Sequence, residues 1–552
     1  MNGLLVYSGL AYLVLALWQS FRNFRKETST PDWEWRLSIW LCLAYLGLVC
    51  VRIGMFDASY SLLDNVEPGV ISTAWNWNRG GPLYHNLDSP ERYSLVYGPY
   101  YYLVVWAFLR LLGPSLLAAK LSGAFLLGAS VILLGQTLRR SVSRATVILC
   151  ITYAVLALVL RSPVNTSYGV RAEPHLIFWT AVGLYASGLS NRALAGCLCG
   201  LATGLLITIK LHGALYASPF LALLYQKHGS RVVAGSLSVA VAQALAPFVL
   251  LPEISLPNYL AWLGLAFKHG LSSSWKSTCR FEAILLSPIA AGLISLALMD
   301  VRAFRAFVVQ NRALLAATAL SLLLVVVPAS KTGSGPWHVF PLILPLALVL
   351  GLLISRLCEC RQVGSVWSRL LAPAVGLGYA LRILVLAVPG HVSALSMERK
   401  ADTACRAMAA ELTEIERRLP PGKTLSVGYG SNDELALMLS IATISALHGN
   451  TFLIDPTALQ DMKQGGIGIP LPLLADLRQG RVYAWVLPAH QEPFTLWSEY
   501  ERDCQPRPML FDPEFRKLFL ENYAVTETTP HFEVWTYQGS VPLGTNSAGD
   551  VP

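Results

Sequence analysis

The chain has 552 residues, of which 54% are hydrophobic and only 14% are charged, and its mean hydropathy is +0.50. This composition excludes an ordinary soluble globular protein and is typical of a protein with many membrane spans. The net charge of +9 at pH 7 does not indicate a nucleic-acid partner, because basic residues of membrane proteins gather in cytoplasmic loops and orient the helices.

Apolar stretches of about 20 residues, the length that crosses a bilayer as a helix, recur from the N-terminus to about residue 390. The first, at residues 3–21, is followed by "RNFRK", which predicts an uncleaved anchor whose N-terminus lies outside. We expect a polytopic α-helical membrane region over residues 1–390 with about twelve spans. Residues 391–552 carry charges and turn signals at the density of a soluble domain.

The basic clusters that follow the later apolar stretches, "LRRSVSR", "QKHGSR" and "DVRAFRAFVVQNR" among them, suit alternate cytoplasmic turns. This alternation holds only if residues 97–113, "YGPYYYLVVWAFLRLLG", do not cross the membrane. The segment is rich in Tyr and Trp, which favour the membrane–water interface, so we expect an interfacial helix there. The loops at residues 56–116, 161–174, 252–282 and 331–336 then share the external face with the C-terminal domain.

Ionisable side chains in these external loops are the candidate functional residues, since such groups at membrane depth tend to face a cavity or a partner. Two carboxylates of the first loop are the candidate catalytic groups, Asp64 and Glu67. The candidate substrate-binding residues are Tyr97, Tyr101, Arg171, Glu173, Lys210, His212, Lys268, His269, Lys331 and His338.

Structural roles compete with these functional ones. Asp64 and Glu67 precede a helical pattern that Pro68 opens, so either carboxylate is also a candidate helix cap. Lys210 ends an apolar run, where lysines extend their ammonium groups to the interface. A carboxylate with several cations nonetheless suits attack by a hydroxyl on a sugar that leaves from a lipid-linked phosphate, with the carboxylate as general base and the cations on the phosphate.

The order of several motifs along the chain carries a family resemblance. The first external loop ends in "GGPLYHN" and "VYGPYYYLVVWAFLRLLG", and is followed by "RAEPHLIFWTAVGLYA", "GLATGLLITIKLHGALYASPFLALLY" and "KTGSGPWHVFPLILPLAL". Over about residues 35–390 this order resembles the GT-C superfamily of integral-membrane glycosyltransferases. Within the superfamily it is similar to the branch of the protein O-mannosyltransferases and the lipid A aminoarabinose transferase.

The resemblance implies a helical bundle, a catalytic acid in the first external loop and a sugar donor on a polyprenyl or dolichyl phosphate. It favours Glu67 as that acid. "DNVE" stands where the branch commonly has an Asp-Glu dipeptide, which leaves the choice between Asp64 and Glu67 open. Glu173 stands where members of the family often have Asp after Arg-Pro. Lys210 matches the lysine that ends a "GLAxLTK" helix, and Lys331 with His338 matches a late external loop.

We therefore expect a membrane glycosyltransferase that acts on a lipid, glycan or protein acceptor, in the bacterial inner membrane with its site facing the periplasm. Asp64, Glu67 and Glu173 are the candidate ligands if a divalent cation, Mg or Mn, takes part. The alternative is a transporter or flippase for a lipid-linked anionic glycan, in which the same cations line a path across the membrane.

The C-terminal domain is predicted to be α/β. Helices are expected at residues 399–419 and in "NDELALMLSIATIS", and strands in "KTLSVGYG", "RVYAWVLP" and "HFEVWTYQ". Cys405 and Cys504 are candidates for a disulfide if this domain lies in an oxidising compartment.

Overall fold

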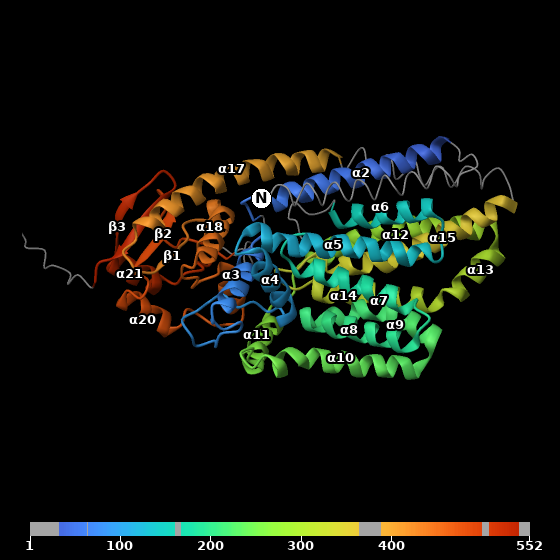
Figure 1. Ribbon diagram of the computed structural model, residues 1–552, viewed down its shortest axis with the longest axis horizontal. Helices are drawn as coiled ribbons and strands as arrows, with labels where there is room; N and C mark the ends of the chain where they lie inside the picture. Colours follow the sequence, from blue (N-terminus) through green and yellow to red (C-terminus); the bar gives the residue numbers. More distant parts are fainter. Residues whose placement is uncertain (1–32, 63, 160–166, 364–387, 499–506, 540–552) are drawn as a thin grey trace, which may run out of the picture.

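The computed structural model describes residues 33–62, 64–159, 167–363, 388–498 and 507–539. These residues form an elongated helical bundle that carries a smaller mixed domain at one end (Figure 1). The predicted anchor at residues 3–21 and Cys504 lie outside the described residues.

The bundle is built from helices, most of which run roughly along the long axis of the molecule (Figure 1). In chain order they are α2 (Trp33–Asp57), α3 (Glu67–Asn78), α4 (Pro99–Leu112), α5 (Leu116–Arg139), α6 (Arg144–Val159), α7 (Ala172–Ser187), α8 (Arg192–Ile209), the short 3-10 turn η1 (Leu211–Gly213), α9 (Ala214–His228), α10 (Ser230–Leu250), α11 (Leu256–Lys268), α12 (Ser274–Met299), α13 (Val301–Gln310), α14 (Arg312–Ala329), η2 (Pro336–Leu342) and α15 (Ile343–Val363).

Seven helices in the described part of the chain are long and apolar enough to cross a membrane. The predicted polytopic helical architecture is therefore confirmed, whereas the expected number of about twelve spans is not. Helix α4, at 14 residues, extends about 21 Å at 1.5 Å per residue, which is short of a hydrocarbon core about 30 Å thick. It lies between the bundle and the C-terminal domain (Figure 1), where the sequence predicts an interfacial helix.

Helices α8 and α10 pack closely because α8 presents a stripe of small residues, Gly196, Gly200 and Gly204. A methyl group at Gly200 would lie 2.4 Å from the carbonyl oxygen of Ser236, and one at Gly204 would lie 2.6 Å from that of Ala240. Glycines at this spacing let two helix backbones approach within a membrane, where van der Waals contact drives association. The stripe fixes the C-terminal end of α8, which carries Lys210.

The C-terminal domain is a small α/β unit. It consists of α17 (Val388–Arg418), β1 (Leu425–Val427), η4 (Asn432–Glu434), α18 (Leu435–His448), α19 (Pro456–Gln464), α20 (Leu471–Gln479), β2 (Ala484–Pro488), α21 (Pro513–Asn522), β3 (Tyr523–Thr528) and β4 (Phe532–Tyr537). The sheet order is β1-β2-β4-β3, with β1 parallel to β2 and the other pairs antiparallel. All five predicted elements are present, while α19, α20, α21 and β3 went unpredicted.

The C-terminal domain is bound to the first external loop by backbone hydrogen bonds. The amide of Arg92 donates to the carbonyl of Leu453 at 2.8 Å, and the amide of Asp455 donates to the carbonyl of Arg92 at 2.7 Å. The Thr457 hydroxyl donates to the carbonyl of Asn65 at 2.8 Å. These contacts place α19 beside the start of α3.

Candidate active site

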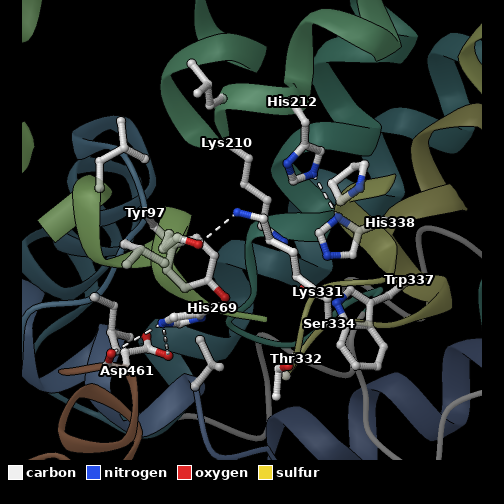
Figure 2. Close-up of a pocket in the computed structure, with 18 of the residues that line it drawn as sticks. Tyr97, Lys210, His212, His269, Lys331, Thr332, Ser334, Trp337, His338 and Asp461 are labelled. Atoms are coloured by element: carbon white, nitrogen blue, oxygen red, sulfur yellow. Dashed lines mark hydrogen bonds and ion pairs between the residues drawn. The ribbon is translucent and has the colours of Figure 1, made fainter. Parts of the chain in front are cut away.

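A cavity of about 1010 Å³ lies where the external loops meet the C-terminal domain. Eight of the twelve predicted site residues line it: Asp64, Tyr97, Arg171, Lys210, His212, His269, Lys331 and His338. Figure 2 shows Lys210, His212, Lys331 and His338 gathered on one side of this cavity and His269 with Asp461 on another. The structure thus brings together residues that lie up to 274 positions apart in the chain (64 to 338).

Asp64 is the carboxylate of the first loop that lines the cavity. Its Oδ1 accepts hydrogen bonds from the amide of Val66 at 2.8 Å and from Arg171 Nη1 at 2.6 Å. The first bond is an Asx turn that leads the chain into α3, so Asp64 has a local structural role as well. Both contacts use Oδ1, and Oδ2 has no hydrogen-bond partner among the described residues.

Ion pairs connect four of the predicted residues into a continuous chain. Arg171 pairs with Asp64 at 2.6 Å and with Glu173 at 3.2 Å, and Lys210 Nζ pairs with Glu173 Oε1 at 2.6 Å. Glu173 is 1% exposed and lies behind the cavity wall. Burial lowers the pKa of Lys210, and the negative charge of Glu173 partly offsets this effect. Two carboxylates therefore hold two cations at the cavity surface.

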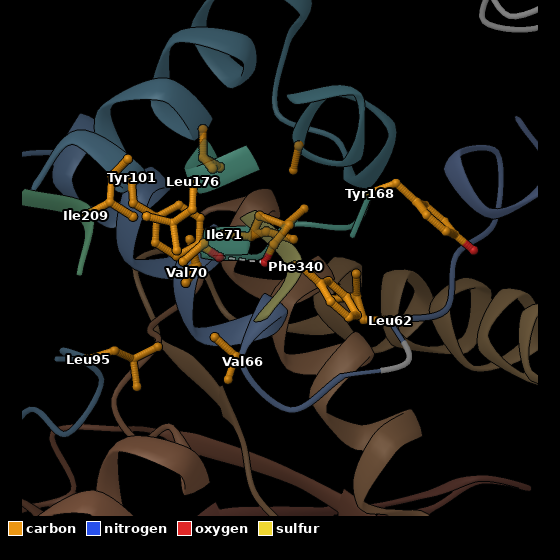
Figure 3. Packing of buried hydrophobic residues seen from close by; sticks show 14 of the residues in the cluster. Leu62, Val66, Val70, Ile71, Leu95, Tyr101, Tyr168, Leu176, Ile209 and Phe340 are labelled. Atoms are coloured by element: carbon orange, nitrogen blue, oxygen red, sulfur yellow. Dashed lines mark hydrogen bonds between the residues drawn. The ribbon is translucent and has the colours of Figure 1, made fainter. Parts of the chain in front are cut away.

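Glu67 lies outside the cavity lining, although the family resemblance favours it as the catalytic acid. It opens α3, is 1% exposed, and its Oε1 accepts from the amide of Val170 at 2.7 Å. Its Oε2 has no hydrogen-bond partner among the described residues. Burial, together with the charge of Asp64, raises the pKa of Glu67 to about 7. Around it the start of α3 packs through Val66, Val70 and Ile71 (Figure 3).

Lys120, in the middle of an apolar stretch, was not among the predicted site residues. It is fully buried in α5, and its Nζ donates to four oxygens at 2.8–2.9 Å, namely the carbonyls of Phe56, Ser59 and Ser61 and the Ser59 hydroxyl. An ammonium group surrounded in this way fixes the start of the first external loop. A lone lysine within an apolar run is the sequence signal that could have found it.

Two histidines face each other at the cavity wall. His338 Nδ1 and His212 Nε2 are 2.8 Å apart, and the carbonyl of His338 accepts from the Tyr216 hydroxyl at 2.7 Å. Burial lowers the pKa of His212 to about 3, so this imidazole is neutral at physiological pH. Nearby, Lys331 Nζ donates to the carbonyl of Ala266 at 2.8 Å (Figure 2). The neutral imidazole of His212 and the ammonium group of Lys331 can therefore both donate hydrogen bonds to an anionic group.

An apolar flank completes the cavity. Leu211, Phe267 and Val327 line it and are 49%, 65% and 63% exposed. Such exposed apolar side chains on a membrane protein suit contact with acyl or isoprenoid chains. The cavity therefore passes from a charged interior to an apolar opening.

The C-terminal domain supplies part of the wall through Thr457 and Asp461 of α19. His269 Nε2 lies 3.3 Å from the carbonyl oxygen of Asp461 and 3.9 Å from its Oδ1. Of the remaining predicted residues, Lys268 donates to the carbonyl of Gly465 at 3.0 Å, which links α11 to the same domain. The fully buried Tyr101 donates to the carbonyl of Val170 at 2.7 Å. Both residues support the cavity without lining it.

The three carboxylates considered as ligands for a divalent cation do not form a joint ligand set. Asp64 and Glu173 are paired with Arg171 and Lys210, and Glu67 is buried against the amide of Val170. Within the described ranges no group of three His, Cys, Asp or Glu residues is placed to hold a metal ion. An arrangement in which cations already neutralise the carboxylates does not fit a Mg or Mn site.

Several solved structures are similar to this chain. The chain is similar to the apo crystal structure of ArnT from Cupriavidus metallidurans, with a TM-score of 0.50 and 15% identity over 89% of this chain and 97% of that one. It also matches the archaeal oligosaccharyltransferase AglB from Archaeoglobus fulgidus, with a TM-score of 0.41 and 11% identity over 91% of this chain and 75% of that one. The arabinosyltransferase EmbB from Mycobacterium smegmatis matches with a TM-score of 0.38 and 13% identity over 80% and 46%.

No protein-family model matches the sequence. No curated protein matches it either. The likeness to ArnT gives this chain the GT-C fold. The predicted fold class is thereby confirmed.

Proposed function

We propose that this protein is a glycosyltransferase that moves a sugar from a polyprenyl-phosphate donor to a lipid, glycan or protein acceptor at the external face of the membrane. The observation that carries the proposal is the composition of one cavity. Its wall combines the carboxylate of Asp64, the cations Arg171, Lys210 and Lys331, and an exposed apolar flank. A lipid-linked sugar phosphate needs these three kinds of surface together.

The donor is expected to bind across the boundary between the charged and the apolar parts of the cavity. Its isoprenoid chain lies against the exposed side chains of Phe267 and Val327. Its phosphate lies at Lys210 and Lys331, where ammonium groups and the neutral His212 donate hydrogen bonds. The sugar is then held between the phosphate and Asp64.

In the proposed reaction an acceptor hydroxyl attacks the anomeric carbon, and the bond between that carbon and the phosphate oxygen breaks. Asp64 Oδ2 takes the hydroxyl proton, while Arg171 keeps the carboxylate in place through Oδ1. The polyprenyl phosphate leaves with its additional negative charge stabilised by Lys210 and Lys331. Glu173 positions two of the cations without contacting the reacting atoms.

The test is incubation of the purified protein, in lipid nanodiscs, with radiolabelled polyprenyl-phosphate sugars and membrane lipid extracts, followed by separation of the labelled products. Product formation with at least one pair supports the proposal. Movement of a labelled lipid-linked glycan across vesicles without any product would support a transporter or flippase instead.

The location proposed for the protein is the bacterial inner membrane, with the cavity on the periplasmic side. Its support is the basic turns that meet at one end of the bundle, where Arg140 Nη1 donates to the carbonyl of Tyr185 at 2.9 Å and Lys227 donates to that of Gly188 at 2.6 Å. An impermeant thiol reagent applied to a Ser334→Cys variant in spheroplasts tests this orientation. Labelling at position 334 only after the membrane is opened would contradict the proposed orientation.

A further inference from the structure

A second pocket, of about 310 Å³, lies between the first external loop and the C-terminal domain. Asn76, Arg79, Glu91 and Tyr93 line it from the loop side, and Lys423, Thr424 and residues 449–453 line it from the C-terminal domain. None of these residues belongs to the cavity described above. A pocket of this volume is large enough to hold a small ligand.

The charged side chains of this second pocket are not held in close ion pairs with described residues. Among the described residues, none forms an ion pair with Arg79, Glu91 or Lys423. Arg79 donates only weakly, to the carbonyl of Asn450 at 3.4 Å, and its guanidinium lies 3.8 Å from the position of a methyl group on Gly449. Lys423 lies over the ring of Tyr483 at 5.1 Å. Two cations and one carboxylate thus remain available to a ligand.

Two buried aromatic rings close the second pocket from behind, and an amide group lies at its wall. The rings of Tyr93 and Phe452, 1% and 7% exposed, have centroids 6.0 Å apart. Asn76 Nδ2 donates to the Tyr93 hydroxyl at 2.8 Å, which orients the amide, and its Oδ1 accepts no hydrogen bond from a described residue. Amide and carboxylate groups such as those of Asn76 and Glu91 suit the hydroxyls of a sugar ring.

We propose that this second pocket binds an oligosaccharide that carries an acidic substituent, with Arg79 and Lys423 on the acid and Asn76 and Glu91 on the hydroxyls. Helix α3 joins this pocket to the cavity, since it starts at Glu67 beside Asp64 and ends beside Arg79. Its 12 residues extend about 18 Å at 1.5 Å per residue. The bound saccharide would be the remote end of the acceptor, and this part of the proposal rests on the proposed function. The binding of an acidic saccharide in the second pocket does not depend on it.

The experiment measures binding of two disaccharides of equal size to the full-length protein in detergent, by isothermal titration calorimetry and saturation-transfer NMR. The acidic probe is cellobiouronic acid and the neutral probe is cellobiose. We expect the acidic probe to bind about tenfold more tightly, which corresponds to about 1.4 kcal/mol for the added charge-assisted contacts. Arg79→Gln and Lys423→Gln are each expected to weaken its binding about threefold, and together about tenfold, and to leave cellobiose binding unchanged.

Lys517→Gln is the matched control, because Lys517 is an exposed lysine of the same domain outside the second pocket. It should bind both probes as the wild type does, and all variants should keep the wild-type thermal unfolding midpoint. Absence of saturable binding of either disaccharide, or equal affinity of the acidic probe in the Arg79→Gln/Lys423→Gln double variant and the wild type, would overturn the proposal. Binding without any sugar transfer would leave the second pocket standing and remove the proposed function.

Discussion

Replacing Asp64 with asparagine tests which of the two candidate catalytic carboxylates, Asp64 or Glu67, acts as the base. The amide oxygen still accepts from Val66 and Arg171, so the turn into α3 is kept, but an amide takes up no proton. Loss of a general base typically slows a reaction 10²- to 10⁴-fold, which corresponds to about 3–5 kcal/mol of barrier. We expect Asp64→Asn to lower the rate of sugar transfer by this factor.

Glu67→Gln is expected to behave differently, because Glu67 is sealed from the cavity and its Oε1 needs only to accept from the amide of Val170. A glutamine preserves that acceptor, so the transfer rate should stay within about tenfold of wild type. Asp88→Asn, at an exposed carboxylate of the same loop, is the matched control and should be fully active.

The assay is single-turnover transfer from a radiolabelled polyprenyl-phosphate sugar at saturating donor, so that a change in binding does not hide a change in chemistry. An inactive Glu67→Gln beside an active Asp64→Asn would refute the assignment and return the role of base to Glu67. Equal and large losses in both variants would show that the two carboxylates act as one unit.

Three further outcomes follow from the described contacts. Arg171→Gln leaves its two carboxylate partners without their shared cation and should destabilise the protein by about 3–5 kcal/mol, seen as a lower thermal midpoint in detergent; an unchanged midpoint contradicts this. Burial raises the pKa of Glu67 from 4.5 to about 7, so between these pH values the folded state binds a proton that the unfolded chain releases. The free energy of unfolding of the wild type should therefore fall by at most about 3 kcal/mol as the pH rises from 4.5 to 7. Glu67→Gln should lack this fall in pH-dependent melts. A methyl group at Gly98 would lie 1.3 Å from the carbonyl oxygen of Thr208, so Gly98→Ala should lower the folded yield several-fold, whereas Gly47→Ala, with no atom within 4 Å, should not.

The sequence predicted which side chains gather, because a single physical rule sorts them. Basic clusters orient the helices, and the orientation assigns Asp64, Arg171, Lys210, Lys331 and the other candidates to one face. Eight of those twelve residues line one cavity. The rule predicts which end of a helix a residue occupies. A charged side chain at membrane depth avoids the lipid, so the charged side chains at that end gather in a shared cavity.

The same rule does not separate residues that line a cavity from those that lie one layer behind it. Asp64 and Glu67 are three positions apart, yet one faces the cavity and the other is buried against Val170. The difference is set at the start of α3, where Glu67 accepts a hydrogen bond from the amide of Val170, 103 residues away in the sequence. A contact at this separation cannot be predicted from the local sequence. Lys120 was missed for a related reason, since its four oxygen partners come from a bend that only tertiary packing creates.

The C-terminal domain helps to position the first external loop, which is held from both sides. From the membrane side, Lys120 holds the carbonyls that precede Asp64. From the other side, Thr457 donates to the carbonyl of Asn65, directly after Asp64, and Asp455 packs so closely against α3 that a methyl group at Gly69 would lie 2.5 Å from its Oδ2. A carboxylate fixed by two bodies moves when either of them moves. In the reaction proposed above, a shift of the C-terminal domain on acceptor binding would move Asp64 relative to the donor phosphate and so couple acceptor binding to the chemical step.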